Sequence, residues 1–296
     1  MTRRGWWLFL SLAVIWGVPY LLIKVAVREL SPASLVFLRT ALGAALLLPV
    51  ALARGRLAAL LPRWRPIALF TVTELAIPWF LLADVERRVS SSLAGLVIAS
   101  VPTVGALLSR LSGGRDPLGA RRVAGMGVGL AGVAALLGLD LGSGDLLAVA
   151  ELGLVVAGYA FAPQVVAREL ADVPALDVVT ASLALCALLY APFGLAQLPA
   201  AFPGWDAVGA VIALGVLCTA VAFILFFSLI AEVGPVRATL ITYLNPAVAV
   251  VAGVALLGEP LTAGTVLGFV LILSGTWLAT SAPAPLSAPA ACESTP

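Results

Sequence analysis

The feature that most constrains this chain is a series of ten apolar runs, separated by short stretches that carry charges, proline or glycine. A transmembrane helix takes about 20 mostly apolar residues, and each run comes close to that length. In lipid only a helix satisfies its own backbone hydrogen bonds within one run. We therefore predict an all-α polytopic membrane protein with ten transmembrane helices near 6–27, 33–53, 66–83, 90–110, 120–139, 145–166, 175–197, 206–230, 237–257 and 263–281.

Composition leaves no room for a further domain. Of the 296 residues, 62% are hydrophobic and 11% are charged, whereas an ordinary soluble chain is about 45–50% apolar. Ten helices of about 20 residues use about 200 residues, so the loops and tails share the remainder. A soluble globular protein is excluded. The last segment, 282–296, is rich in Pro, Ala and Ser and is predicted to be a disordered tail.

Several residue types that carry chemistry are missing. The chain has no histidine, so the usual imidazole base and zinc ligand are absent. Its single lysine, Lys24, does not follow the glycine pattern of a phosphate-binding loop, and its three cysteines lack metal-site spacing. We expect no cofactor, no metal and no ATP-driven pumping. Basic loops that contact anionic lipid explain the positive charges without a nucleic-acid partner.

The distribution of Arg and Lys predicts the orientation in the membrane. If the N-terminus lies inside, 12 of the 17 basic residues fall on the inner side, and cytoplasmic loops carry such an excess. We therefore expect a multi-pass protein of the cell (plasma or inner) membrane with both termini cytoplasmic. The inner residues are Arg3, Arg4, Arg54, Arg56, Arg63, Arg65, Arg110, Arg115, Arg121, Arg122, Arg168 and Arg237.

An internal repeat divides the ten helices into two sets of five. When Pro102 is placed on Pro246, other positions coincide: Ala94 with Ala238, Leu96 with Leu240, Gly114 with Gly258 and, after one inserted residue, Gly125 with Gly268 and Gly132 with Gly275. We place the first repeat at 1–139 and the second at 140–281. Because five crossings are an odd number, the second repeat must be inverted. Inverted repeats are typical of secondary transporters, with the substrate site near the membrane midplane.

Short motifs occur in a fixed helix order: Trp16-Gly17 in the first helix, Arg39 in the second, and Asn245-Pro246, Gly258-Glu259-Pro260-Leu261 and Gly268 in the ninth and tenth. On these residues the chain resembles a ten-helix member of the drug/metabolite transporter superfamily, EamA type. The first repeat departs from the pattern with Gly114-Arg115-Asp116-Pro117-Leu118. The resemblance implies a transporter of small metabolites whose central cavity is bounded by helices 1–4 and 6–9, and it leaves the substrate open.

Among the ionisable residues inside apolar runs, where a charge is costly and marks a functional candidate, three stand out. They are Glu74 in the third run, Arg39 in the second and Glu151 in the sixth. A buried carboxyl group tends to hold its proton, so Glu74 is a candidate for a coupling proton. The alternative is structural: Arg39 pairs with Glu74 or with a carbonyl group and ties helices together.

The ninth helix offers a polar face. Thr239, Thr242, Tyr243 and Pro246 follow the i, i+3, i+4, i+7 spacing of one helix face. Asn245 precedes the proline, which leaves a backbone carbonyl free and allows a kink. We predict that Thr242, Tyr243 and Asn245 line the substrate site, although hydroxyl groups also serve helix packing.

The fourth helix mirrors this arrangement. Ser92, Ala99 and Thr103 are spaced to share one face, and Pro102 supplies the break that corresponds to Pro246. Matched breaks in two repeats are a pointer to a binding site. We therefore expect Thr103 to line the site and the two prolines to act as hinges.

Three aromatic residues lie deep in the apolar runs: Trp16, Trp79 and Tyr159. They are candidates to wall a cavity for an amphipathic or aromatic solute, partly through cation–π contacts. Packing within the core is the alternative for all three.

These observations together predict a secondary transporter that moves small organic metabolites, amino-acid-like or drug-like, by alternating access. We expect an exporter that is proton-coupled or exchanges solutes, surrounded by membrane lipid. Gly125 and Gly129 have the spacing for close helix approach, within the chain or in a homodimer, so the unit is a monomer or homodimer. The alternatives are a passive channel and an intramembrane enzyme acting on lipid or isoprenoid. The only dense charged cluster, 84–88, is interpreted as a solvated helix-end loop.

Overall fold

The computed structural model describes residues 2–55, 57–111, 120–140, 145–234 and 238–280, and every regular element within them is a helix. Seven helical stretches in this part of the chain are long and apolar enough to cross a membrane, and three shorter apolar helices accompany them. The ten lie where the sequence predicts them, so the all-α polytopic fold is confirmed. The segment 282–296, Arg115 and Asp116 lie outside the described residues.

The first repeat contains several interrupted helices. Its elements are α1 (Arg3–Gly17), α2 (Pro19–Ala26), α3 (Pro32–Ala53), the 3-10 helix η1 (Leu57–Arg63), α4 (Trp64–Phe70), the π-helix η2 (Thr71–Ala76), α5 (Ile77–Val85), α6 (Ser91–Ile98), α7 (Val101–Leu111) and α8 (Ala120–Asp140).

The second repeat has the same order. Its elements are α9 (Leu146–Glu169), α10 (Ala175–Ala196), α11 (Trp205–Ile212), the π-helix η3 (Ala213–Val221), α12 (Ala222–Val233), the 3-10 helix η4 (Thr239–Tyr243), α14 (Asn245–Leu257) and α15 (Ala263–Thr280).

Local capping sets where the helices begin and end. The side chains of Ser31, Ser90 and Asp145 accept hydrogen bonds from the first turns of α3, α6 and α9, which satisfies donors that a helix start leaves free. Gly258 ends α14 with a φ of 67°, a conformation that costs glycine no steric penalty.

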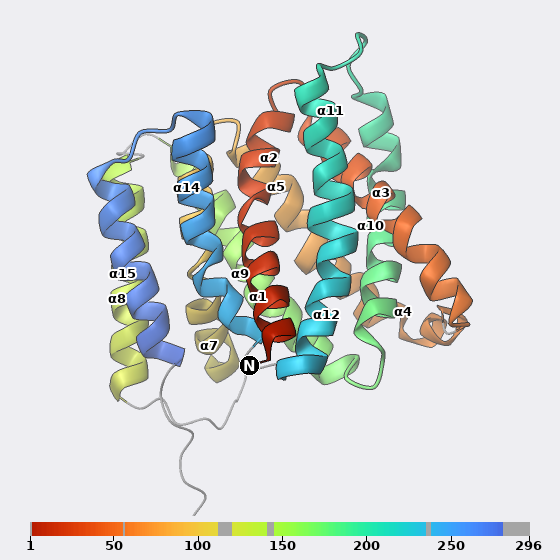
Figure 1. Ribbon diagram of the computed structural model, residues 1–296, viewed down its shortest axis with the longest axis horizontal. Coiled ribbons are helices and arrows are strands. Elements are labelled where there is room, and N and C mark those ends of the chain that lie inside the picture. The colour runs from red at the N-terminus through yellow and green to blue at the C-terminus, as the bar shows by residue number, and fades with distance from the viewer. Residues whose placement is uncertain (1, 56, 112–119, 141–144, 235–237, 281–296) are drawn as a thin grey trace, which may run out of the picture.

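The two repeats pack on each other helix by helix. α3 packs on α10, α6 on α14 and α8 on α15, so the second, fourth and fifth helices of one repeat contact their equivalents in the other. Figure 1 shows α8 and α15 side by side at one edge of the bundle. The start of α1 and the end of α15 both lie at the lower end in this view.

Close packing of α8 on α15 depends on glycine. A Cβ atom added at Gly275 would lie 2.2 Å from the backbone nitrogen of Gly129 and 2.7 Å from the carbonyl oxygen of Gly125. Only residues without a side chain allow backbones to approach this closely. The Gly125 and Gly129 pair therefore serves contact within the chain, one of the two roles predicted for it.

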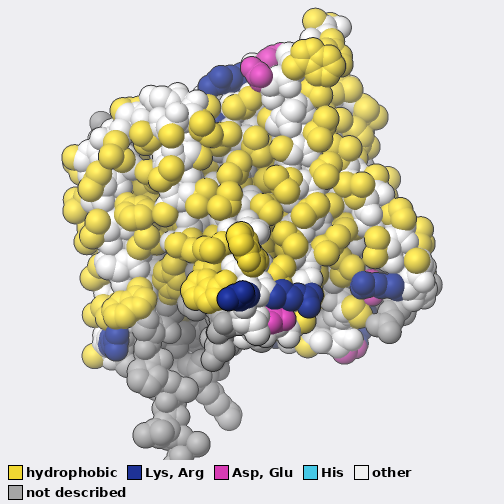
Figure 2. Space-filling model, viewed as in Figure 1, with side chains coloured by type: hydrophobic (Ala, Val, Ile, Leu, Met, Phe, Trp, Pro, Cys, Tyr) yellow, Lys and Arg dark blue, Asp and Glu magenta, His cyan; other side chains and the backbone are white. Residues whose placement is uncertain are grey.

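The surface fits a bilayer. Large apolar side chains stay exposed on the helices, among them Leu188, Val251 and Leu256 with 65–73% of their surface accessible. On the face shown in Figure 2, hydrophobic side chains cover the middle, and Lys, Arg, Asp and Glu gather near the upper and lower edges. Such a band is the surface that lipid tails contact.

The fourth and ninth helices break at matching places. α6 ends at Ile98 and α7 begins at Val101 next to Pro102, while η4 ends at Tyr243 and α14 contains Pro246 in its first turn. The expected breaks are present, and the hinge role of the prolines stays a prediction. The continuous helical faces predicted across them are wrong, because the α-helical register stops at each break.

The third and eighth helices share a feature that hydropathy does not reveal. η2 interrupts the third helix and η3 interrupts the eighth, each between two α-helical pieces. A π turn carries one residue more than an α turn and is frequent at functional sites. The equivalent placement of the two turns makes them part of the repeat itself.

Candidate functional site

Arg39 of α3 is a buried charged residue, and 8% of its surface is exposed. The carbon Cζ of its guanidinium group lies 3.6 Å from the centroid of the Trp79 ring, a cation–π contact. Its Nε donates a hydrogen bond of 3.1 Å to Oγ1 of Thr219. Arg39 therefore joins helices of both repeats, since Trp79 belongs to α5 and Thr219 to η3.

The π turn η3 brings Thr219 to Arg39. A Cβ atom at Gly215 of η3 would lie 3.2 Å from the carbonyl oxygen of Arg39, and one at Gly43 would lie 2.9 Å from Cγ2 of Thr219. The hydroxyl of Thr219 donates to the carbonyl of Leu214, five residues earlier, at 2.8 Å. Small residues and the widened turn thus let α3 and the eighth helix approach at this point.

Arg39 forms no direct ion pair with a carboxylate within the described part of the chain. No carboxylate there lies within 4.0 Å of its nitrogen atoms, and its one side-chain hydrogen bond goes to the neutral Thr219. The predicted alternative of an Arg39–Glu74 ion pair is therefore wrong. A buried guanidinium group that no carboxylate neutralises is suited to bind an anionic ligand.

Two tyrosines extend this centre. Tyr20 of α2 and Tyr159 of α9 lie close enough to Arg39 to interact with it electrostatically. Tyr159 also packs against the buried cluster that contains Trp79. Arg39, Trp79, Tyr20 and Tyr159 form what we call the arginine centre, with one charge and three aromatic rings.

Glu74 lies in η2, one turn before Trp79, and is partly buried. A Cβ atom at Gly158 of α9 would lie 2.5 Å from the carbonyl oxygen of Thr73, so α9 contacts the π turn directly. Tyr159, the next residue, interacts electrostatically with both Glu74 and Arg39. Glu74 is therefore a neighbour of the arginine centre through Tyr159 and not a direct partner of Arg39.

Glu151 lies elsewhere. Its carboxylate is in contact with the guanidinium group of Arg88, which also lies 3.2 Å from Asp84 and 3.5 Å from Asp145. These residues belong to the start of α9, the end of α5 and the turn that follows α5, at the upper end of the bundle. No described contact joins Glu151 to the arginine centre, so its place in a substrate site stays a prediction.

Trp16 and Asn245 hold α1 against the second repeat. The Trp16 ring packs on Phe223 and Phe226 of α12 at centroid distances of 5.9 and 4.8 Å. With its amide nitrogen turned toward them, Asn245 donates to the backbone carbonyls of Ala13 (3.2 Å) and Ile241 (3.0 Å). The Trp16 contact is the core packing that the sequence left open as its alternative, and the place of Asn245 in a substrate site stays a prediction.

Tyr243, Thr242 and Thr103 lie near the helix breaks. The hydroxyl of Tyr243 donates to the carbonyl of Thr276 in α15 at 3.3 Å, and Thr242 in η4 is partly buried. Thr103 is buried in α7, and its hydroxyl has no hydrogen-bond partner among the described residues. Tyr243 ends the 3-10 helix η4 and contacts α15. No described contact joins any of the three residues to Arg39.

The charged turn at 84–88 differs from its prediction as a solvated loop. Glu86 has 0% of its surface exposed, and the amine of Lys24 donates to the carbonyls of Glu86 (2.6 Å) and Val89 (2.7 Å). The turn is buried because α2 and the segment after α14 pack over it. Only Arg87 and Arg88 of this segment are exposed.

Next to this turn, Glu259 caps α6. Its carboxylate accepts from the backbone nitrogens of Ser91 (2.6 Å) and Ser92 (3.0 Å) and from the Ser92 hydroxyl (2.5 Å). Burial alone would raise the pKa of Glu259, but the hydrogen bonds from Ser92 and Ser91 outweigh burial and hold the pKa below its usual value. Glu259 thus ties the second repeat to the start of the fourth helix.

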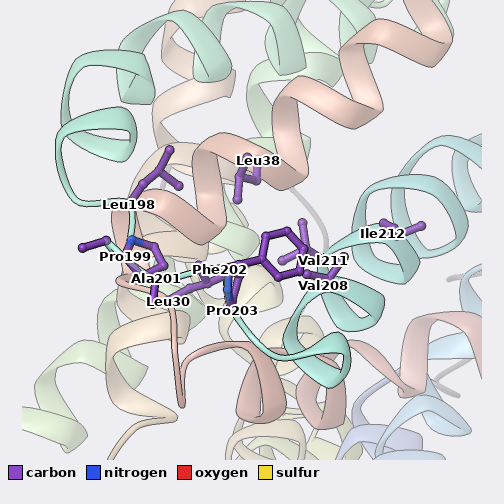
Figure 3. Close-up of a pocket in the computed structure, with 11 residues that line it drawn as sticks. Leu30, Leu38, Leu198, Pro199, Ala201, Phe202, Pro203, Val208, Val211 and Ile212 are labelled. Atoms are coloured by element: carbon purple, nitrogen blue, oxygen red, sulfur yellow. The ribbon is translucent and has the colours of Figure 1, made fainter.

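A pocket of about 420 Å³ opens at the upper end, beside the segment between α10 and α11. Figure 3 shows Leu198, Phe202 and Leu38 among the side chains around it. The lining is apolar, so it offers no group that would orient a polar solute. Leu38 precedes Arg39 in α3, but Arg39 is not among the residues that line the pocket.

Sequence reasoning missed Thr219, Tyr20 and the burial of Glu86. Thr219 carried a weak signal as the single threonine inside the run 206–230. For the buried turn at Glu86, the weak signal was Lys24, the only lysine, whose amine donates to the carbonyl of Glu86. Neither signal shows which residues meet in space.

Ten apolar helices in two inverted repeats, joined at a buried arginine, define a multi-pass membrane protein of the transporter class. The family model described as "EamA-like transporter family" matches residues 3–138 and again residues 143–281, and the chain belongs to this family. Its members are membrane transporters, which confirms the resemblance stated from the motifs.

Solved structures support the fold. One, described as "Crystal structure of protein", is 23% identical with a TM-score of 0.65, and the match covers 95% of this chain and 97% of that chain. A search of curated proteins found no match.

Proposed function

We propose that the chain is a secondary transporter that binds small organic solutes carrying a carboxylate at the arginine centre. Arg39 carries this proposal, because it is a buried cation that no described carboxylate neutralises. A substrate carboxylate would supply the missing charge through two parallel hydrogen bonds.

The aromatic rings of the arginine centre favour an amphipathic solute. The Trp79 ring stacks on the guanidinium group and Tyr159 interacts with it electrostatically, and aromatic walls with one fixed charge are typical of small-molecule sites. An amino-acid-like solute fits this chemistry, with its carboxylate on Arg39 and its side chain against the rings.

Alternating access is supported by the paired interruptions of the helices. The third and eighth helices contain the π turns, and the fourth and ninth contain the breaks. Interrupted helices at equivalent places in inverted repeats let one repeat rock against the other around a fixed site. Export from the cytoplasm, with coupling to protons through Glu74 or to counter-exchange, completes the proposal.

The location and orientation of the transporter follow from the apolar helices and from the distribution of Arg and Lys. The transporter would lie in the cell membrane with both termini cytoplasmic, surrounded by lipid, as a monomer or homodimer and without a nucleic-acid partner. The upper end in Figure 1 would then face outward.

Counterflow of carboxylate-bearing solutes into sealed proteoliposomes tests the proposal. We expect saturable counterflow in the parent chain, loss of it in Arg39→Gln, and full retention in Arg168→Gln, whose side chain is exposed. Flux that neither saturates nor exchanges would favour a channel. A product formed from lipid or isoprenoid by the purified protein in detergent would favour the enzyme.

A further inference from the structure

The turn between α5 and α6 holds a carboxyl group in an unusual position. Glu86 has 0% of its surface exposed, and neither carboxyl oxygen has a hydrogen-bond partner among the described residues. A buried polar group without a partner costs free energy, and an ionised one costs far more. The position is therefore compatible with a neutral, protonated carboxyl group and disfavours a carboxylate.

Lys24 is close by, but its amine is used elsewhere. It donates to the backbone carbonyls of Glu86 and Val89, so it holds the turn against α2. No ion pair within 4.0 Å joins Lys24 to the Glu86 carboxylate in the described structure.

The other groups that face Glu86 come from α2 and from two further elements. Glu259 lies on the segment after α14, Arg39 on α3 and Tyr20 on α2, and all three interact with Glu86 electrostatically. Burial raises the pKa of Glu86 well above its usual value, and Glu259 adds to the rise, while Lys24 and Arg39 lower it only in part. Tyr20 interacts with both Glu86 and Arg39, so polar groups connect the turn to the arginine centre.

We propose that Glu86 is a proton-binding lock, which must take up one proton before the upper end of the bundle can close over it. The proton comes from water at the upper surface when α2, the turn and the segment after α14 come together. It returns to that water when they separate and the carboxyl group is hydrated. The lock rests on the proposed alternating access and adds a titratable site outside the arginine centre.

The direction of the pH effect follows from linkage. The closed form holds the Glu86 proton more tightly than an open, hydrated form does, so closure is favoured at low pH and lost as the pH rises through the raised pKa. For one proton, the ratio of open to closed molecules rises by at most about tenfold for each pH unit.

A distance measurement in lipid nanodiscs tests the lock without any substrate. Spin labels at Ala200→Cys and Leu261→Cys sit on two exposed segments at the upper end, in a background where the native cysteines are replaced by alanine. Between pH 5 and pH 9 we expect the longer distance to gain population in the parent chain. Glu86→Gln is expected to keep the shorter distance throughout.

Two control variants make the outcome decisive. Glu86→Asp keeps a carboxyl group and is expected to keep the pH response, which separates the lock from a folding defect. Glu169→Gln changes an exposed carboxylate at the lower end and is expected to respond like the parent. An unchanged pH response in Glu86→Gln, or no response in the parent chain, would overturn the proposal. If the pH response depends on Glu86 but the protein moves no solute, the transport proposal is refuted, and the lock remains as a pH-dependent closure of the upper end.

Discussion

The two repeats share one backbone plan and differ in chemistry. Both interrupt their third helix with a π turn and their fourth with a break. Yet the register that places Pro102 on Pro246 places Glu74 on Cys218, and the buried arginine has its only described hydrogen-bond partner, Thr219, in the other repeat. At the arginine centre, the first repeat supplies the charged Arg39 and the second supplies the neutral Thr219 and Tyr159.

The largest expected effect is at Arg39, where the repeats differ most. Arg39→Gln removes the cation, and a hydrogen bond to a charged group contributes about 1.5–3 kcal/mol, so we expect counterflow to fall about 100-fold. Thr219→Val, on the side of the second repeat, is expected to lose less because the charge remains. Initial rates of counterflow measure both variants. Equal losses would show that the charge of Arg39 contributes no more to counterflow than the hydroxyl group of Thr219 does.

The next largest effect is expected at the contact between α8 and α15, the fifth helices of the two repeats. Gly275→Val would force a side chain into the backbone of Gly129, and overpacking costs about 1–3 kcal/mol. Gly127→Val is the matched control, because no atom lies within 4 Å of its added Cβ. Thermal unfolding in detergent measures the difference, and a similar Tm for the two variants would contradict the close α8–α15 contact.

A smaller effect is expected from Glu74, which aligns with Cys218 of the second repeat when Pro102 is placed on Pro246. Glu74→Gln cannot gain or lose a proton, so we expect accumulation driven by a proton gradient to fall about tenfold for each pH unit of gradient. Counterflow at equal pH should persist. Cys218→Ser is the control in the second repeat. Gradient-driven accumulation that is the same in Glu74→Gln and the parent would remove Glu74 from proton coupling.

The smallest effect concerns Glu259, the second repeat's one carboxylate at the lock. Its pKa is lowered in the folded protein, so its stabilisation is present above the unfolded pKa and is lost as the pH falls through the folded pKa. Glu259→Gln removes a charged helix cap that contributes about 1 kcal/mol. The difference in Tm between parent and variant should shrink in acid, and a constant difference would contradict this role.

Local signals in the sequence predicted most of the fold. Apolar length located the ten helices, and Pro102 and Pro246 located the breaks, because proline acts on its own helix. The π turns escaped detection since no residue pattern marks them. The contacts of Glu86 and Tyr243 also escaped, because burial of a turn and the direction of a side chain after a 3-10 turn depend on distant helices. Arg39 was found from its cost in lipid, but its partners Trp79 and Thr219 come from other helices.

The π-helix η2 holds one residue more than an α-helix of the same length along the axis, and this residue changes the direction in which later side chains point. One extra residue turns everything above it by about 100° relative to an uninterrupted α-helix, and Trp79 lies just above η2. The stacking of Trp79 on Arg39 therefore depends on a residue count several positions away. A single deletion within 71–76 that spares Glu74 would keep the charge of the chain and all four residues of the arginine centre, and would rotate the Trp79 ring away from the Arg39 guanidinium group.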